Sequence, residues 1–126
     1  MAKTVGIIAE YNPFHNGHYY HLQKAKQEAE ADFCVAVISG NFTQRGETSI
    51  VNKWAKAYMA ICGGADLVIE LPTLYSVSSA ENFANGAIKI LDSLKIVDSF
   101  AFGAEADDLA TLNNIANVLY NEPRGY

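Results

Sequence analysis

The sequence predicts an α/β fold built on a doubly wound, parallel sheet. Short apolar runs alternate with longer segments in which apolar residues recur at helical spacing, and this alternation is typical of βαβ units. The chain has 126 residues, of which 50% are hydrophobic and 18% charged, which is enough for a core of its own. We therefore expect residues 1–126 to form a single domain.

The expected strands and helices alternate along the chain. Strands are predicted at residues 4–9, 33–39, 66–70 and 97–102. One helical face is formed by His18, Leu22, Ala25 and Ala29, and a second by Val51, Trp54, Tyr58 and Ile61. A third consists of Phe83, Ala87, Ile90 and Leu94, and a last helix, Asp108 to Tyr120, carries Leu109, Leu112, Ala116 and Leu119. Gly63-Gly64 is expected to end the second helix, and Ser78 with Glu81 to form a capping box for the third.

Charge, cysteine content and the lack of long apolar runs indicate which partners and which cellular compartment to expect. The net charge of −5 argues against a domain that holds nucleic acid by bulk electrostatics. Residues 1–62 carry six basic and five acidic side chains, or +1, whereas the rest carries three basic and nine acidic, or −6. Cys34 and Cys62 lie in apolar sequence, which favours reduced, packed thiols. No secretory signal and no run of about 20 apolar residues is present, so we expect a cytoplasmic chain that is not bound to a membrane.

The segment His15-Asn16-Gly17-His18 directly follows the first predicted strand. Ligands of open α/β sheets bind beyond the carboxyl ends of the strands, and a helix amino terminus there offers backbone amides and a positive dipole to an anion. Gly17 lets a flat ring or a phosphate approach the backbone. Imidazoles that donate to phosphate oxygens would stabilise charge during adenylyl transfer, and we expect a polyphosphate to keep them protonated near neutral pH.

Other interpretations of this segment stay open. His15, His18 and His21 are spaced three apart, which would suit a metal cluster, but no HExxH motif or well-placed carboxylate accompanies them. We therefore assign no metal site. The turn would also form if Asn16 merely capped the helix and His18 packed inside it. Neither GxGxxG nor GxxxxGK[ST] is present, which argues against a dinucleotide site and a P-loop.

The segment from Ser39 to Glu47 follows the second strand and is expected at the same edge of the sheet. Its polar side chains and glycines suit a small carboxylate or a phosphate, with Arg45 as a fork-shaped donor. A polar turn that caps the next helix is the alternative. Lys53 and Lys56 on that helix would face RNA, phosphates or solvent.

Several other polar and aromatic residues lie near these segments. Glu70 ends the third strand and Glu105 follows the fourth, and neither is assigned a catalytic role. The aromatic residues near the histidines would stack on adenine or pack in the core, and about half are expected in the core. They are Tyr11, Phe14, Tyr19 and Tyr20.

Five strings in order give a more specific signal. They are GIIAEYNPFHNGH at 6–18, SGNFTQRGE at 39–47, GADLVIELP at 64–72, SAENFANGA at 79–87 and FGAE at 102–105. HNGH resembles the "HIGH" motif of nucleotidyltransferases, and the five strings together resemble the bacterial tRNA(Met) cytidine acetate ligase family. The resemblance implies a Rossmann-like, HIGH-type nucleotidyltransferase domain. The chain departs from the family pattern at Thr48-Ser49, where a Pro-Ala pair is usual, and at Asn52 and Lys56, where Asp and Arg are usual.

The resemblance also implies a reaction. The family activates acetate with ATP to give acetyladenylate, then transfers the acetyl group to N4 of the wobble cytidine of elongator tRNA(Met), which becomes N4-acetylcytidine. ATP, with Mg²⁺ held mostly by phosphates and water, would be the cofactor, and acetate and the tRNA the partners. His15 and His18 would be catalytic.

The implied contacts with ATP and acetate involve two sets of residues. ATP would be bound by Ile8, Ala9, Glu10, Tyr11, Asn12, Pro13, Phe14, His15, Asn16, Gly17, His18, Tyr19, Tyr20 and His21, together with Gly103. The candidate substrate residues are Gly40, Asn41, Gln44, Arg45 and Lys53.

Two rival functions use the same fold. One is a small-metabolite adenylyltransferase that acts on pantetheine phosphate or nicotinate mononucleotide, and the other is a non-catalytic module that binds a nucleotide or RNA. Family members are several times longer than this chain. Residues 1–126 are therefore expected to be the amino-terminal catalytic part, with most of the tRNA-binding surface outside them, and no oligomeric state is predicted.

Overall fold

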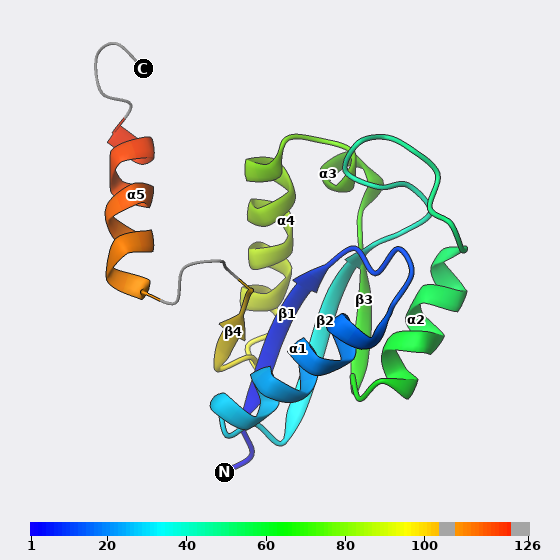
Figure 1. The fold of residues 1–126 in the computed structure, drawn as a ribbon, viewed down its shortest axis with the longest axis horizontal. Coiled ribbons are helices and arrows are strands. Elements are labelled where there is room, and N and C mark those ends of the chain that lie inside the picture. The colour runs from blue at the N-terminus through cyan, green and yellow to red at the C-terminus, as the bar shows by residue number, and fades with distance from the viewer. Residues whose placement is uncertain (104–107, 122–126) are drawn as a thin grey trace.

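A four-stranded parallel sheet forms the centre of the molecule (Figure 1). The computed structural model describes residues 1–103 and 108–121. The strands are β1 (Thr4–Ala9), β2 (Phe33–Ser39), β3 (Leu67–Leu71) and β4 (Ser99–Ala101), in the order β3-β2-β1-β4. The bounds of β1 and β2 agree with the prediction, whereas β3 lies one residue later and β4 is shorter than expected.

Helices cover both faces of the sheet, which confirms the doubly wound α/β class. Helices α1 (Asn16–Glu28) and α2 (Lys53–Cys62) pack on one face, where Ile7, Leu22 and Ala60 belong to one core cluster. Helix α4 (Ala80–Ser93) packs on the other, where Val37 and Leu91 belong to a second cluster. The short helix α3 (Thr73–Ser76) precedes α4, and no residue of α5 (Leu109–Asn121) is buried among those described.

The apolar faces predicted for α1 and α4 point into these cores, but the one predicted for α2 does not. Trp54 is 75% exposed and Tyr58 is 72% exposed, and Ile61 is exposed as well. Lys56 and Ala60 are the buried residues of α2. Helical spacing therefore identified α2 correctly, and the inference that its apolar face is the buried one is wrong.

Two local predictions also need correction. The side chain of Ser79, not of Ser78, caps α4, because its Oγ accepts a hydrogen bond from the backbone N–H of Asn82. The Ser78 hydroxyl donates to the carbonyl of Tyr75 instead. Cys34 is buried as expected, whereas Cys62 is exposed, and both thiols are free.

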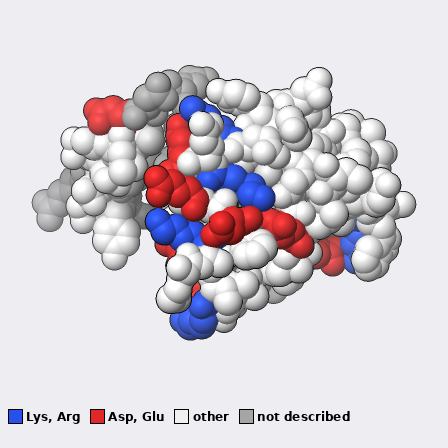
Figure 2. Space-filling model, turned by 90° about the horizontal axis from the view of Figure 1, so that it is seen from below, with Lys and Arg blue, Asp and Glu red and all other residues white. Residues whose placement is uncertain are grey.

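Charges of both signs are mixed at the end of the molecule where the strands begin. Figure 2 shows this end, with acidic and basic side chains next to one another. Lys3 Nζ lies 3.8 Å from Glu30 and Lys26 Nζ lies 3.5 Å from Asp66. Surface pairs of this kind contribute little to stability, and their mixture gives this end no single-sign field. Over the residues that the structure describes, no helix is both long and apolar enough to span a membrane.

Candidate functional site

The HNGH turn lies at the carboxyl edge of β1, and its two histidines cap α1 reciprocally. His15 is the N-cap residue, and its Nδ1 accepts a hydrogen bond of 3.0 Å from the N–H of Gly17. His18 Nδ1 in turn accepts one of 3.2 Å from the N–H of His15. The arrangement is a capping box made of two imidazoles. The alternative in which Asn16 caps the helix is wrong, because Asn16 is already the first helical residue.

These contacts fix which ring nitrogen carries the proton. Since each Nδ1 accepts a hydrogen bond, a neutral ring is protonated at Nε2, and within residues 1–103 and 108–121 neither Nε2 has a hydrogen-bond partner. The two rings stack with centroids 3.7 Å apart. Burial, then the neighbouring His15 and His21, lowers the pKa of His18. The geometry favours a neutral ring at His18, which still donates through Nε2–H. That a bound polyphosphate protonates the histidines stays a prediction.

Gly17 has a steric role in this turn. A Cβ at position 17 would lie 2.8 Å from Cε1 of His15, so a larger residue would displace the capping ring. The flat ring that approaches the backbone of Gly17 is therefore the imidazole of His15 itself. The ring of Tyr11 packs edge-on against the ring of His18, with 4.8 Å between the two centroids, and so supports the pair.

The aromatic residues near the turn divide as expected between core and surface. Tyr11 is buried, with a backbone φ of 50°, and burial raises the pKa of its hydroxyl. Phe14 packs against the same core cluster. Tyr19 and Tyr20 are exposed on α1. Only the latter two offer rings to a ligand at the surface.

Two residues of the first motif hold the second loop in place. Glu10 Oε2 accepts hydrogen bonds from the N–H of Gln44 at 3.0 Å and from the hydroxyl of Ser39 at 3.3 Å. Asn12 Oδ1 accepts one of 2.7 Å from the N–H of Ile50. The EYN segment thus joins the ends of β1 and β2, a link that the sequence did not predict.

The second loop is a narrow hairpin. Phe42 and Thr48 form an antiparallel bridge, the N–H of Gly46 donates to the carbonyl of Thr43 at 2.9 Å, and Gly46 has a φ of 81°. Arg45, at the tip, is exposed. Asn41 Oδ1 accepts a hydrogen bond of 2.8 Å from the N–H of Lys53. The base of the loop therefore binds the first turn of α2, as expected if this segment is a polar turn that caps the helix. Its tip is exposed to solvent.

Two lysines of α2 face the end of β2 in different ways. Lys53 Nζ lies 3.1 Å from Oε1 of Glu70, and the Glu70 carboxylate lies so close to Gly40 that a Cβ there would displace it. Lys56 is 0% exposed and donates to the carbonyls of Ser39 and Gly40 at 2.8 and 2.9 Å, and to Ser39 Oγ at 3.1 Å. The expectation that Lys56 faces solvent, RNA or phosphates is wrong. In the sequence, the small residues Ala60 and Gly63 lie at helical spacing from Lys56, and they indicate that this face of α2 is the one that packs closely.

The remaining site residues lie at the same edge of the sheet or in its strands. A Cβ on Gly103 would lie 3.9 Å from Cδ2 of His21, so the end of β4 lies beside α1. Ile8 and Ala9, at the end of β1, pack against the two core clusters. Pro13 is half-buried in the turn, and Glu105 lies outside the described residues. In that part of the chain, no three His, Cys, Asp or Glu side chains are grouped to hold a metal ion.

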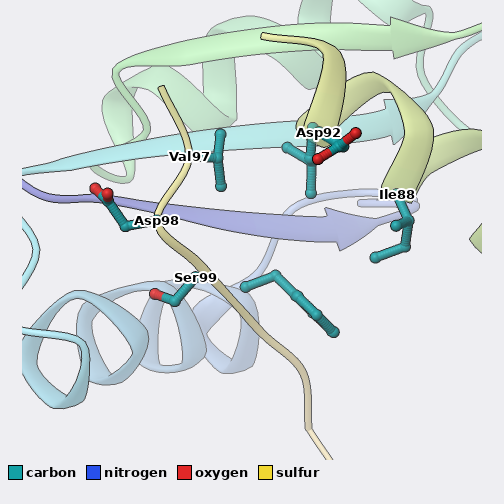
Figure 3. A pocket seen from close by; sticks show the side chains of 7 residues that line it. Ile88, Asp92, Val97, Asp98 and Ser99 are labelled. Atoms are coloured by element: carbon teal, nitrogen blue, oxygen red, sulfur yellow. The ribbon is translucent and has the colours of Figure 1, made fainter. Parts of the chain in front are cut away.

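Two surface hollows lie at different distances from the carboxyl edge of the sheet. One lies between α2 and the ends of β2 and β3, and Gly40, Lys53, Trp54 and Glu70 contribute to its walls. The other lies at the start of β4, lined by residues that include Ile88, Asp92, Val97, Asp98 and Ser99 (Figure 3). Asp98 there accepts a hydrogen bond from the N–H of Thr4. Only the first hollow adjoins the loops that follow the strands.

Comparison with known proteins agrees with this geometry. The HIGH Nucleotidyl Transferase family matches residues 2–126. A tRNA(Met) cytidine acetate ligase of Thermoanaerobacter pseudethanolicus is 60% identical over 122 residues, which are 97% of this chain and 30% of that protein. One of Acetivibrio thermocellus is 56% identical over 124 residues, with 98% and 30% covered. The crystal structure of Thermotoga maritima TmcAL bound with alpha-thio ATP superposes with a TM-score of 0.90 at 44% identity, over 96% of this chain and 29% of that one. The chain thus spans about 30% of the length of these relatives.

Proposed function

Because the chain belongs to the HIGH nucleotidyl transferase family, we propose that it is the ATP-binding, acetate-activating part of a tRNA(Met) cytidine acetate ligase. The capping box of His15 and His18 carries the proposal, since it presents two Nε2–H donors at the carboxyl edge of β1. An acetate oxygen attacks the α-phosphorus of ATP in line, and pyrophosphate leaves. The N4 amine of the wobble cytidine then attacks the acetyl carbonyl, and AMP is released.

His15 and His18 have the chemistry that the first step needs. Negative charge builds on the phosphate oxygens as pyrophosphate leaves, and donors held in place beforehand stabilise it. The start of α1 adds backbone amides and the positive end of its dipole. We assign the contacts with ATP to residues 8–21 and to Gly103, with Tyr19 and Tyr20 as the exposed rings available to adenine. Within this segment, the side chains of Glu10 and Asn12 also hold the second loop in place.

The second loop and the start of α2 provide the donors for acetate. Gly40, Asn41, Gln44, Arg45 and Lys53 lie there, and Arg45 and Lys53 carry the positive charges that a carboxylate needs. Lys53 already pairs with Glu70, so acetate would compete with that carboxylate for the ammonium. Mg²⁺ would travel with the triphosphate, which supplies most of its ligands together with water.

The test of the proposal is exchange of pyrophosphate into ATP by the protein. We expect exchange to require acetate. Exchange that depends on phosphopantetheine or on a mononucleotide instead would identify the rival adenylyltransferase. Nucleotide binding without any exchange would indicate the non-catalytic module. Labelled acetate appearing as acetylcytidine in tRNA(Met) tests the second step.

Substitutions of His18 distinguish the roles of its two ring nitrogens. His18→Ala should slow exchange by about 100-fold, the scale of one lost transition-state donor. His18→Gln keeps a donor near the Nε2 position and should retain more activity than His18→Asn, which keeps an acceptor near Nδ1 and should retain more thermal stability. An unchanged exchange rate in His18→Ala would remove this residue from the mechanism.

A further inference from the structure

Lys56 is a buried cation that occupies the point where β2 ends. Its side chain is 0% exposed, and its three contacts are with Ser39 O, Ser39 Oγ and Gly40 O. An ammonium has three donors, so these oxygens account for all of them. The ladder between β2 and β3 ends at the pair Ser39 and Leu71, and Lys56 supplies hydrogen bonds to the carbonyls just where that ladder stops.

The contacts of Lys56 continue toward the first motif. Ser39 Oγ, which accepts from Lys56, donates to Glu10 Oε2 at 3.3 Å. The same Glu10 oxygen accepts from the N–H of Gln44 at 3.0 Å. One chain of hydrogen bonds therefore runs from α2, through the end of β2, to the residue after β1 and back to the second loop.

The charge of Lys56 is balanced by two carboxylates. Burial lowers the pKa of its ammonium, and Glu10 and Glu70, which lie on opposite sides of Ser39 and Gly40, raise it. Lys56 is the buried member of this group, since Glu10 is partly buried and Glu70 is exposed. Removing its ammonium leaves the carbonyls of Ser39 and Gly40 without this donor, and an unpaired buried acceptor is costly. The cap of α1, in contrast, is made by His15 and His18 alone and does not depend on Lys56.

We propose that Lys56 is a positioning residue, which fixes the end of β2 and so holds the loop of residues 40–49 in register with Glu10 and the HNGH turn. The inference rests on the proposed function in one respect, namely that this loop binds acetate. It assigns Lys56 an effect on the acetate step that is separate from ATP binding, because the turn that receives the triphosphate is capped independently.

The test measures the KM for acetate and the Kd for ATP separately in Lys56→Met. This substitution nearly keeps the volume of the side chain and removes its charge. The KM for acetate in the exchange reaction should rise at least about tenfold, a change equivalent to one lost hydrogen-bonded contact. The Kd for ATP, measured by calorimetry without acetate, should stay within about threefold. Lys56→Arg, which keeps the charge, should restore most of the acetate KM. Lys24→Met, which removes an exposed lysine of α1 paired with Glu28, is the matched control and should resemble the wild type.

Ser39→Ala keeps the proposal testable if Lys56→Met does not fold. It removes the hydroxyl that links Lys56 to Glu10 and leaves both carbonyl contacts, so the KM for acetate should rise by a smaller factor with the Kd for ATP unchanged. Equal losses of acetate and ATP binding, or no change in either, would overturn the proposal.

Hydrogen exchange separates this proposal from the proposed function. The amides of residues 40–49 should exchange faster in Lys56→Met than in Lys24→Met, while those of residues 15–19 should not. If the wild type shows no acetate-dependent exchange of pyrophosphate, the function is wrong, and the amide pattern alone then decides whether Lys56 positions the loop. Unchanged protection of residues 40–49 would show that it does not.

Discussion

Helices α1 and α2 start at the same edge of the sheet and pack on the same face, yet α1 buries only apolar side chains, whereas α2 buries a lysine beside Ala60. Helix α1 buries Leu22 and Ala25 and places two histidines at its exposed start. Helix α2 buries Lys56 and leaves Trp54 exposed. Since Lys56 donates to the carbonyls of Ser39 and Gly40 at the end of β2, the difference shows that a helix face carrying a charge can be the buried one, against the apolar pattern of the sequence.

The largest effect expected from this comparison concerns stability. Leu22→Ala should lower the free energy of unfolding by about 2–5 kcal/mol, because it removes a fully buried side chain and leaves a cavity. Tyr58→Ala on α2 should change it by no more than about 0.5 kcal/mol, since that ring is exposed. Urea unfolding of both variants measures the contrast. A similar loss in both would mean that the outer face of α2 is covered.

The sequence was sufficient for the fold where side-chain pattern and burial agree. Strands β1 and β2 have the predicted bounds, and Leu22 and Ala87 lie on helix faces that are buried as predicted. The resemblance drawn from the five strings is confirmed, because matches to acetate ligases and to the HIGH family extend along the chain. These features are local or come from recurring motifs, so periodicity and motif spacing are enough to find them.

The position of the candidate site could be predicted from the sequence, but the hydrogen bonds that connect its segments could not. Parallel strands bring their carboxyl ends together, so the HNGH and SGNFTQRGE segments were expected at one edge. Glu10 binds the backbone of Gln44, and Lys56 reaches the end of β2. Both contacts join residues that are 16 or more positions apart in the sequence. No pattern within a single element encodes such contacts.

A smaller effect on stability is expected from the N-caps of the two helices. His15 caps α1 through Nδ1, and Asn52 caps α2 through Oδ1, which accepts from the N–H of Ala55 at 2.9 Å. His15→Ala and Asn52→Ala should each lower the free energy of unfolding by about 1 kcal/mol. Asn16→Ala should lower it by much less, because Asn16 caps nothing. Thermal unfolding ranks the three, and a larger loss for Asn16→Ala than for His15→Ala would contradict the imidazole cap.

The smallest expected effect is a pH dependence that only α1 should show. Burial lowers the pKa of His18 in the folded chain, so the unfolded chain, with a pKa near 6.5, takes up the proton first as the pH falls. The stability that the neutral ring contributes is fully present above about pH 6.5 and is lost as the pH falls through the folded pKa.

Urea titrations between pH 5 and 8 of the wild type, His18→Asn and Asn52→Ala measure this effect, where the chosen range brackets the reference pKa of about 6.5. The stability advantage of the wild type over His18→Asn should shrink on acidification, whereas its advantage over Asn52→Ala should stay constant, since an amide does not titrate. An advantage over His18→Asn that grows at low pH would mean that the fold favours the imidazolium. The capping box, which requires Nδ1 of His18 to accept a hydrogen bond from the backbone N–H of His15, would then not describe the start of α1.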